Sequence, residues 1–211
     1  VRPDPSFPSG AAVTVTGVLM AGGDSRRMGR DKATLVLHDA TFWQIQLRTL
    51  DALGLDALGV AARRDPPWRP SCVAWFADPP DTPECGPLAA LGPLLQGIGT
   101  THLLVLAVDL PRVEPAWFRT HVPRLAPGRG FVPKTGAFYQ PFAAVYPREA
   151  ADEAVRRRAA GRLRLQEWVE ALVENGLLSV IDIDPATAGA FHNVNAPEDH
   201  ARLLQRNDEP E

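Results

Sequence analysis

The sequence has very little cysteine and no long apolar run, and each shortage excludes a class of protein. Cys72 and Cys85 are the only two cysteines, too few for a disulfide framework or for a thiolate zinc site. The longest wholly apolar run, 103–108, is far shorter than the roughly 20 residues of a membrane-spanning helix. The first ten residues carry prolines and an acid where a signal peptide needs an apolar segment. We therefore expect a cytoplasmic protein without a membrane partner.

An excess of charge of one sign is also missing. The 22 basic and 25 acidic residues give a net charge of -3, so the charge balance does not favour a nucleic acid or a membrane surface as partner. Lysine is scarce, because 20 of the basic residues are arginine and only Lys32 and Lys134 remain. In such a chain a lysine indicates a place that needs a compact ammonium.

The composition that remains is that of a folded protein, with 45% apolar and 22% charged residues among 211. Apolar segments bounded by turn residues alternate with stretches of helical periodicity, which predicts an α/β fold around a mostly parallel sheet. We expect a flexible N-terminal extension over residues 1–14, one domain over residues 15–205 and a short tail over residues 206–211.

Local patterns place the elements of this fold. Strands are predicted at Val13–Leu19, Leu58–Ala62, Cys72–Phe76, His102–Val108, Phe138–Tyr146 and Leu178–Ile183. Helices are predicted at Thr41–Gly54, Gly86–Ile98, Leu165–Leu172 and Pro197–Gln205. In the first of these helices Thr41 and Gln44 form a capping box. Trp43 and Trp168 are expected in the core.

The segment GVLMAGGDSRRMGRDK, residues 17–32, holds the densest chemical signals. Its glycines allow close approach of the backbone to a ligand, and consecutive N–H groups in such a loop bind anions. Arg26, Arg27 and Lys32 add charge-assisted donors. The spacing fits neither GxGxxG nor GxxxxGK[ST]. The segment predicts a phosphate-binding loop, and the alternative is a glycine turn with solvated basic side chains.

Two aspartates follow predicted strands. Asp109 comes directly after the most apolar one, where a carboxylate can bind a divalent cation such as Mg²⁺ beside a phosphate. Its alternative role is to cap a helix near Glu114. Asp78 precedes two prolines, so it is equally well interpreted as an ordinary turn residue.

The glycine segment resembles the nucleotidyltransferase superfamily, whose signature runs through Ala and two Gly to Arg-Met-Gly and a Lys. Within it the chain is most similar to the molybdenum cofactor guanylyltransferases. Further agreement comes from Asp78 followed by 86–88 (GPL), from 108–111 (VDLP) and from 193–199 (NVNAPED). The resemblance spans about residues 17–204. It implies a single-domain, Rossmann-like three-layer α/β/α sandwich with a mostly parallel mixed sheet.

The same resemblance implies the roles of individual residues. Lys32 is expected to bind the phosphates and Asp109 to hold Mg²⁺, and with Arg27 they form the expected catalytic set. The residues expected to contact the nucleotide or the second substrate are Met20, Ala21, Gly22, Gly23, Lys32, Asp78, Asp109, Asn193 and Asn195. For the two asparagines the alternative is capping of the helix that starts near Pro197.

Two positions depart from the family pattern. Met20 replaces the usual Ala or Leu, a mild change where backbone atoms make the contact. Ala61 or Ala62 stands where relatives can carry an Asn that contacts the base, a departure that concerns guanine selectivity and not nucleotidyl transfer.

The resemblance implies transfer of GMP from GTP to molybdopterin, with or without molybdenum, and release of pyrophosphate. Molybdoenzymes or their chaperones are the implied downstream partners. The alternatives are cytidylyl transfer to the same cofactor, nucleotidyl transfer to a sugar phosphate, and a non-catalytic GTP-binding carrier of the cofactor.

Overall fold

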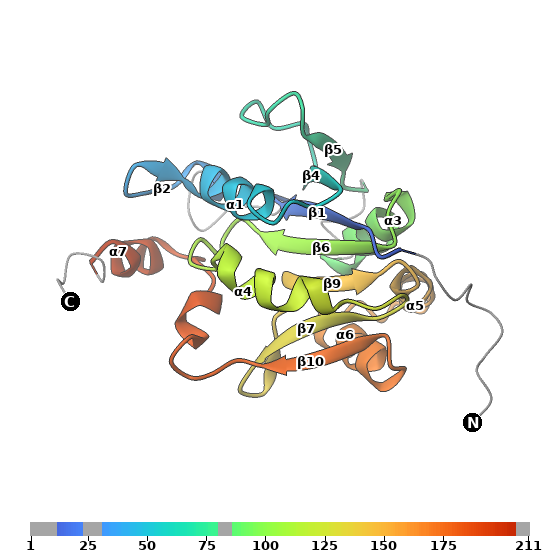
Figure 1. Cartoon of the computed structure of the whole chain (residues 1–211). Coiled ribbons are helices and arrows are strands. Elements are labelled where there is room, and N and C mark those ends of the chain that lie inside the picture. The colour runs from blue at the N-terminus through green and yellow to red at the C-terminus, as the bar shows by residue number, and fades with distance from the viewer. Residues whose placement is uncertain (1–11, 23–30, 80–85, 206–211) are drawn as a thin grey trace, which may run out of the picture.

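A mixed sheet of eight strands runs through the middle of the computed structural model, which describes residues 12–22, 31–79 and 86–205 (Figure 1). The strand order is β10-β7-β9-β6-β1-β4-β5, and β8 pairs with β7 outside this path. The strands are β1 (Val15–Met20), β4 (Ala57–Ala62), β5 (Ala74–Ala77), β6 (His102–Ala107), β7 (Gly130–Thr135), β8 (Phe138–Tyr139), β9 (Ala143–Pro147) and β10 (Leu178–Asp182). A small antiparallel pair, β2 (Val36–Leu37) and β3 (Ala40–Thr41), stands apart.

Most of the pairing in the large sheet is parallel. β1 runs parallel to both β4 and β6, β4 to β5, and β10 to β7. β9 lies antiparallel to β6 on one side and to β7 on the other. The prediction of a mostly parallel mixed sheet is confirmed.

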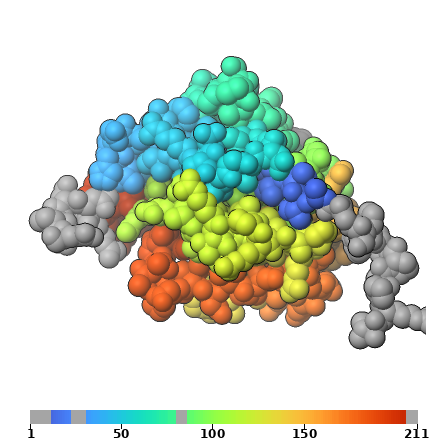
Figure 2. Space-filling view, viewed as in Figure 1, coloured from blue at the N-terminus to red at the C-terminus, as the bar shows by residue number. Residues whose placement is uncertain are grey.

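Helices cover both faces of the sheet. The helices are α1 (Phe42–Asp51), α3 (Leu88–Gly97), α4 (Pro115–His121), α5 (Ala150–Ala159), α6 (Leu165–Glu174) and α7 (Pro197–Gln205). The short 3-10 helices are η1 (Lys32–Thr34), η2 (Val122–Arg124) and η3 (Ala188–Phe191). Side chains of α1 and α4 share one buried cluster, and those of α3, α5 and α6 share the other. In Figure 2 the regions of α1 and α4 lie side by side on the near face of the molecule.

Side chains of β1 pack against the helices on both faces of the sheet. Leu19 packs into the α1 and α4 cluster, whereas Val18 and Met20 pack into the α3, α5 and α6 cluster. Successive side chains of a strand point to opposite faces, so a strand that is buried on both faces is mostly apolar, and in β1 only Thr16 is polar. The three-layer α/β/α sandwich is thereby confirmed.

The predicted helices are present with small differences at their ends. The α1 capping box forms, with the Thr41 backbone N–H donating to Gln44 Oε1 at 2.9 Å. Gly54 follows α1 with φ +61°, a left-handed conformation that favours glycine. α3 begins at Leu88, two residues after the predicted start at Gly86, with Pro87 as its N-cap.

One predicted strand is interrupted. The run Phe138–Tyr146 divides into β8 and β9 around Gln140 and Pro141, because proline has no N–H to donate to a sheet. Tyr146 Oη donates to the Pro141 carbonyl at 2.7 Å and holds the break in place. The first strand begins at Val15 instead of Val13, and Cys72–Phe76 is shifted to β5.

The two predicted core tryptophans differ in burial. Trp168 is fully buried, whereas Trp43 is partly buried and packs at the edge of its cluster. Among the described residues no helix is long and apolar enough to cross a membrane. Most of the predicted N-terminal extension and all of the predicted tail lie outside the described residues.

Candidate functional site

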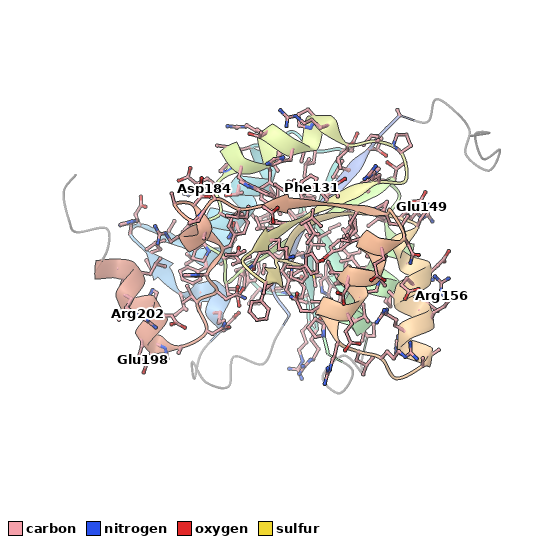
Figure 3. All side chains as sticks on the ribbon, turned by 90° about the horizontal axis from the view of Figure 1, so that it is seen from below. Phe131, Glu149, Arg156, Asp184, Glu198 and Arg202 are labelled. Carbon is pink, nitrogen blue, oxygen red and sulfur yellow. The ribbon has the colours of Figure 1, made fainter. Side chains whose placement is uncertain are left out.

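The candidate site lies where four parallel strands end. β1, β4, β5 and β6 run in the same direction, so the residues that follow them meet at one edge of the sheet. Ala21, Arg63, Asp78 and Asp109 stand at or just after these strand ends. Figure 3 shows Asp184, which follows β10, toward the same end of the molecule as Glu198 and Arg202 of α7, with Glu149 at the opposite end.

The turn after β6 fixes the position of Asp109. Val108 donates its N–H to the Met20 carbonyl at 3.0 Å and Leu110 donates to the Ala107 carbonyl at 3.3 Å. Gln46, fully buried in α1, donates Nε2 to the Leu110 carbonyl. The carboxylate of Asp109 therefore projects from a turn that is bonded to its neighbours on two sides.

Gln46 was not predicted from the sequence. It stands on the buried stripe of α1 between Phe42 and Leu50, four residues from each. A polar side chain on such a stripe is the signal that indicates a buried hydrogen bond.

Lys32 and the two asparagines converge on Asp109. Lys32 Nζ lies 3.3 Å from Asp109 Oδ2 and donates to Asn195 Oδ1 at 2.7 Å. Asn193 Nδ2 lies 3.4 Å from both carboxylate oxygens of Asp109. The Val194 N–H between the asparagines donates to the Asp109 carbonyl at 2.9 Å. Four predicted site residues thus form one cluster, with side chains of Lys32 and Asp109 that are 19% and 16% exposed.

The observed contacts do not make Asp109 the cap of the helix near Glu114, nor the Asn195 side chain the cap of α7. The nearest helix after Asp109 is α4, whose N-cap is Glu114. At the start of α7 the backbone N–H groups of Asn195 and Ala196 donate to Asp199 Oδ2 at 3.0 and 2.9 Å. These hydrogen bonds, led by the one from Asn195, lower the pKa of the Asp199 carboxyl. The Asn195 side chain is left to bond Lys32.

Asp78 and Gly22 come together at the other side of the site. A Cβ on Gly22 would lie 2.3 Å from Asp78 Oδ2, so the carboxylate occupies the space that the glycine leaves open. The Asp78 N–H donates to the Ala62 carbonyl at 3.1 Å. Burial raises the pKa of the Asp78 carboxyl, and the charge of Arg63 opposes this shift. A local turn role does not account for this contact with a residue 56 positions away.

A pocket of about 530 Å³ opens beside Gly22. The loop between β4 and β5 forms most of its wall, and the remainder comes from the end of β1 and the start of η1. Its lining residues are Ala21, Gly22, Asp31, Ala62, Arg63, Arg64, Asp65, Pro66, Pro67 and Trp68.

The remaining predicted site residues have other surroundings. The Met20 side chain packs into the buried α3, α5 and α6 cluster and is outside the pocket lining. A nucleotide contact from Met20 would therefore use its backbone. Gly23 and Arg27, together with Arg26 and Cys85, lie outside the described residues.

The donor set around Asp109 fits a hard divalent cation. Among the described residues no group of three or more His, Cys, Asp or Glu stands ready to hold a metal. Mg²⁺ is commonly bound by one or two carboxylates with substrate phosphates and water completing its shell. The single carboxylate of Asp109, beside two asparagine amides, meets that requirement.

Comparison with known proteins adds to this geometry. The model of the MobA-like NTP transferase domain matches residues 17–175. The probable molybdenum cofactor guanylyltransferase of Opitutus terrae is 34% identical over 197 residues, which cover 92% of this chain and 96% of that protein.

Solved structures share the fold at lower identity. Molybdopterin-guanine dinucleotide biosynthesis protein A from Archaeoglobus fulgidus is 20% identical, with a TM-score of 0.69 over 91% of this chain and 98% of that chain. The 4-diphosphocytidyl-2C-methyl-D-erythritol synthase from Anaerococcus prevotii is 9% identical, with a TM-score of 0.70 over 93% of this chain and 97% of that chain. Proteins named for different nucleotides therefore share this architecture.

Proposed function

The chain belongs to the family of MobA-like NTP transferases, and we propose that it transfers GMP from GTP to molybdopterin. In this reaction a terminal phosphate oxygen of molybdopterin forms a bond to the α-phosphorus of GTP. The bond from that phosphorus to the bridging oxygen breaks, and pyrophosphate leaves with its electron pair. The product is the guanine dinucleotide form of the cofactor.

The observation that carries the proposal is the convergence of Lys32, Asp109, Asn193 and Asn195 beside the pocket at Gly22. Lys32, Asp109 and the asparagine pair lie far apart in the sequence and meet at the carboxyl edge of the sheet. Relatives named molybdenum cofactor guanylyltransferase that match 88% or more of this chain support the same substrates.

The chemistry of phosphate transfer matches what the cluster offers. Such a transfer needs positioning and positive charge on the developing oxyanions more than it needs a covalent intermediate. The Lys32 ammonium supplies charge for the triphosphate, and the Asn193 and Asn195 amides supply donors and acceptors for a polar second substrate. A phosphate nucleophile is already ionised at neutral pH, so the reaction needs no general base.

Asp109 is the residue that would hold Mg²⁺, and the Gly22 and Asp78 pair would lie against the nucleotide. A bound Mg²⁺ supplies positive charge to the phosphates in transfers of this class. The proposed catalytic set is completed by Arg27, which the sequence motif adds.

Guanine selectivity is proposed to reside in the loop after β4. Ala61 and Ala62 are buried and carry only methyl groups, so neither side chain can hydrogen-bond a base. The residues that follow, 63–68, line the pocket, and Arg63, Arg64, Asp65 and Trp68 among them carry polar groups.

We expect GTP to bind at least about tenfold more tightly than CTP in the presence of Mg²⁺, the difference of about one well-placed hydrogen bond. Isothermal titration calorimetry with both nucleotides measures it, and ATP serves as the purine control. Equal or tighter binding of CTP would favour cytidylyl transfer.

The decisive experiment incubates the protein with molybdopterin, Mg²⁺ and each nucleoside triphosphate in turn. Mass spectrometry identifies the dinucleotide, and a coupled assay measures pyrophosphate. We expect product and pyrophosphate in equal amounts with GTP. Binding of GTP and molybdopterin without pyrophosphate release would instead identify a carrier.

A further inference from the structure

The loop between β4 and β5 lines the pocket and is held in shape by internal hydrogen bonds. Arg69 donates Nε and Nη2 to the two carboxylate oxygens of Asp65 at 2.6 and 2.7 Å, and Nη1 to the Val73 carbonyl. A bidentate pair of this kind fixes direction as well as distance. These hydrogen bonds of Arg69 connect the chain before Trp68, at Asp65, with the chain after it, at Val73.

Trp68 itself stacks on α1. Its ring centroid lies 5.1 Å from that of Trp43, with an angle of 15° between the planes. The stack anchors the pocket wall to a helix that also supplies Gln46 to the turn after Asp109. One face of the Trp68 ring is therefore held by α1 while its residue lines the pocket.

The edge of the Trp68 ring reaches the residue before Lys32. The indole Nε1 donates to Asp31 Oδ2 at 3.4 Å. The other oxygen, Asp31 Oδ1, accepts the Ala33 N–H at 3.0 Å and caps η1, whose first residue is Lys32. Asp31 thus divides its carboxylate between the pocket wall and the short helix that carries the lysine.

We propose that Trp68 is a positioning residue for Lys32: through Asp31 it fixes the start of η1, so that the nucleoside pocket and the phosphate-binding ammonium form one preorganised unit. The proposal rests on the assignment of Lys32 to the phosphates in the proposed function. It adds a link from the β4–β5 loop to the catalytic cluster that the sequence motifs do not contain.

Two substitutions separate this link from the packing of the wall. Trp68→Phe keeps an aromatic ring against Trp43 but removes the indole N–H. Asp31→Asn keeps an oxygen to cap η1 but presents an amide where the indole needs an acceptor. Both remove the same hydrogen bond, so their effects should not add.

The matched control is Trp75→Phe. Trp75 likewise donates its indole N–H, but to a backbone carbonyl, that of Ala62 at 3.1 Å. It is 40% exposed and lies outside the pocket lining. Trp75→Phe removes this hydrogen bond and so tests whether the loss of any indole hydrogen bond near the loop weakens pyrophosphate binding.

The measurement is the calorimetric binding of two probes, neither of which requires molybdopterin or turnover. Inorganic pyrophosphate reports on Lys32, and guanosine reports on the pocket wall. We expect Trp68→Phe and Asp31→Asn to weaken pyrophosphate binding about three- to tenfold, the scale of one hydrogen bond, and to change guanosine binding less than twofold. Trp75→Phe should leave both unchanged.

The test through Lys32 decides the mechanism. In a Lys32→Ala background, Trp68→Phe should cause no further loss of pyrophosphate binding. A further loss there, unaltered pyrophosphate binding in Trp68→Phe, or no pyrophosphate binding by the wild type would each overturn the proposal. A loss confined to guanosine would make Trp68 only a wall residue and overturn it too. Absence of dinucleotide synthesis would refute the proposed function while leaving these binding results interpretable.

Discussion

At the scale of single residues, the two lysines show what a scarce residue type can indicate. Lys32 stands in an ion pair with Asp109 at the carboxyl edge of the sheet. Lys134, in β7, lies over the ring of Tyr139 with its ammonium 5.3 Å from the centroid, an ordinary cation–π contact. Of the two lysines, one therefore lies in the candidate site and one outside it.

Lys32→Ala should lower turnover by about 10² or more, the scale of losing one preorganised charge donor. Its ammonium is partly exposed and its ion pair contributes little to folding, so the melting temperature should change by only a few degrees. Steady-state pyrophosphate release and thermal unfolding measure the two effects. Lys134→Ala is the control and should keep near-normal turnover; similar losses in both variants would remove the special role of Lys32.

Asp109→Asn should abolish most metal-dependent turnover while the protein stays folded. The amide keeps the size of the carboxylate and can still accept from Lys32, but it lacks the charge that a hard divalent cation needs. The measurement is the rate against Mg²⁺ concentration for both proteins. A full-height curve with an unchanged midpoint for the variant would contradict a metal role.

How much of the site the sequence predicts depends on the kind of contact. Lys32, Asp109, Asn193 and Asn195 belong to recognisable motifs, and their convergence follows from parallel strands that share one edge. Trp68 belongs to no recognisable motif. Its contact with Asp31, 37 residues away, forms only when the loop over residues 63–73 folds back on the start of η1. Such long-range partners cannot be paired without the fold.

At the scale of elements, β7 and β9 approach each other unusually closely at one point. A Cβ on Gly130 would lie 1.9 Å from the Val145 carbonyl oxygen. The Gly130 N–H donates to the Leu177 carbonyl on its other side at 2.9 Å. The strand is thus fixed between neighbours where only glycine fits.

Gly130→Ala should destabilise the fold by about 1–3 kcal/mol or more, because the methyl group meets backbone that cannot rotate away. Urea unfolding followed by circular dichroism gives the free energy of unfolding. The control is Gly97→Ala at the end of α3, where nothing lies within 4 Å of the added Cβ. That variant should be neutral or more stable by up to about 1 kcal/mol, and equal behaviour of the two would refute the close approach.

β7, which the sequence did not predict, shares this dependence on neighbours. β7 begins at Gly130 and contains Pro133, residues that indicate a turn when read alone. Gly130 permits the close approach to β9, which the local sequence does not reveal. Helices with strong periodicity, such as α1 and α6, need no such knowledge and were predicted correctly.

At the scale of the whole molecule, His102 joins the start of β6 to the segment before β7. The imidazole is fully buried, with Nδ1 2.9 Å from Thr101 Oγ1 and Nε2 3.3 Å from the Arg129 carbonyl. Burial lowers the pKa of His102 below its ordinary 6.5, against smaller opposing effects from the Arg129 carbonyl and Glu149. Folding therefore favours the neutral ring.

This shift predicts lower stability in mild acid. Below about pH 6.5 the unfolded chain binds a proton at His102 that the folded chain resists, so the free energy of unfolding falls as the pH falls toward the folded pKa. His121, whose pKa burial also lowers, acts with the same sign. Denaturant unfolding of the wild type and His102→Gln between pH 7.5 and pH 5 should give a shallower fall in the variant; parallel curves would contradict the assignment.

The hydrogen bond from the Val194 N–H to the Asp109 carbonyl implies an order in which the parts of the candidate site form during synthesis. On a ribosome, the strands β1, β4, β5 and β6 emerge first and can pair among themselves, since they are neighbours in the sheet. Asn193 and Asn195 are synthesised more than 80 residues after Asp109. A nascent chain therefore carries Lys32 and Asp109 long before it carries their asparagine partners, and this cluster of side chains is completed only when the segment after β10 folds back to Asp109.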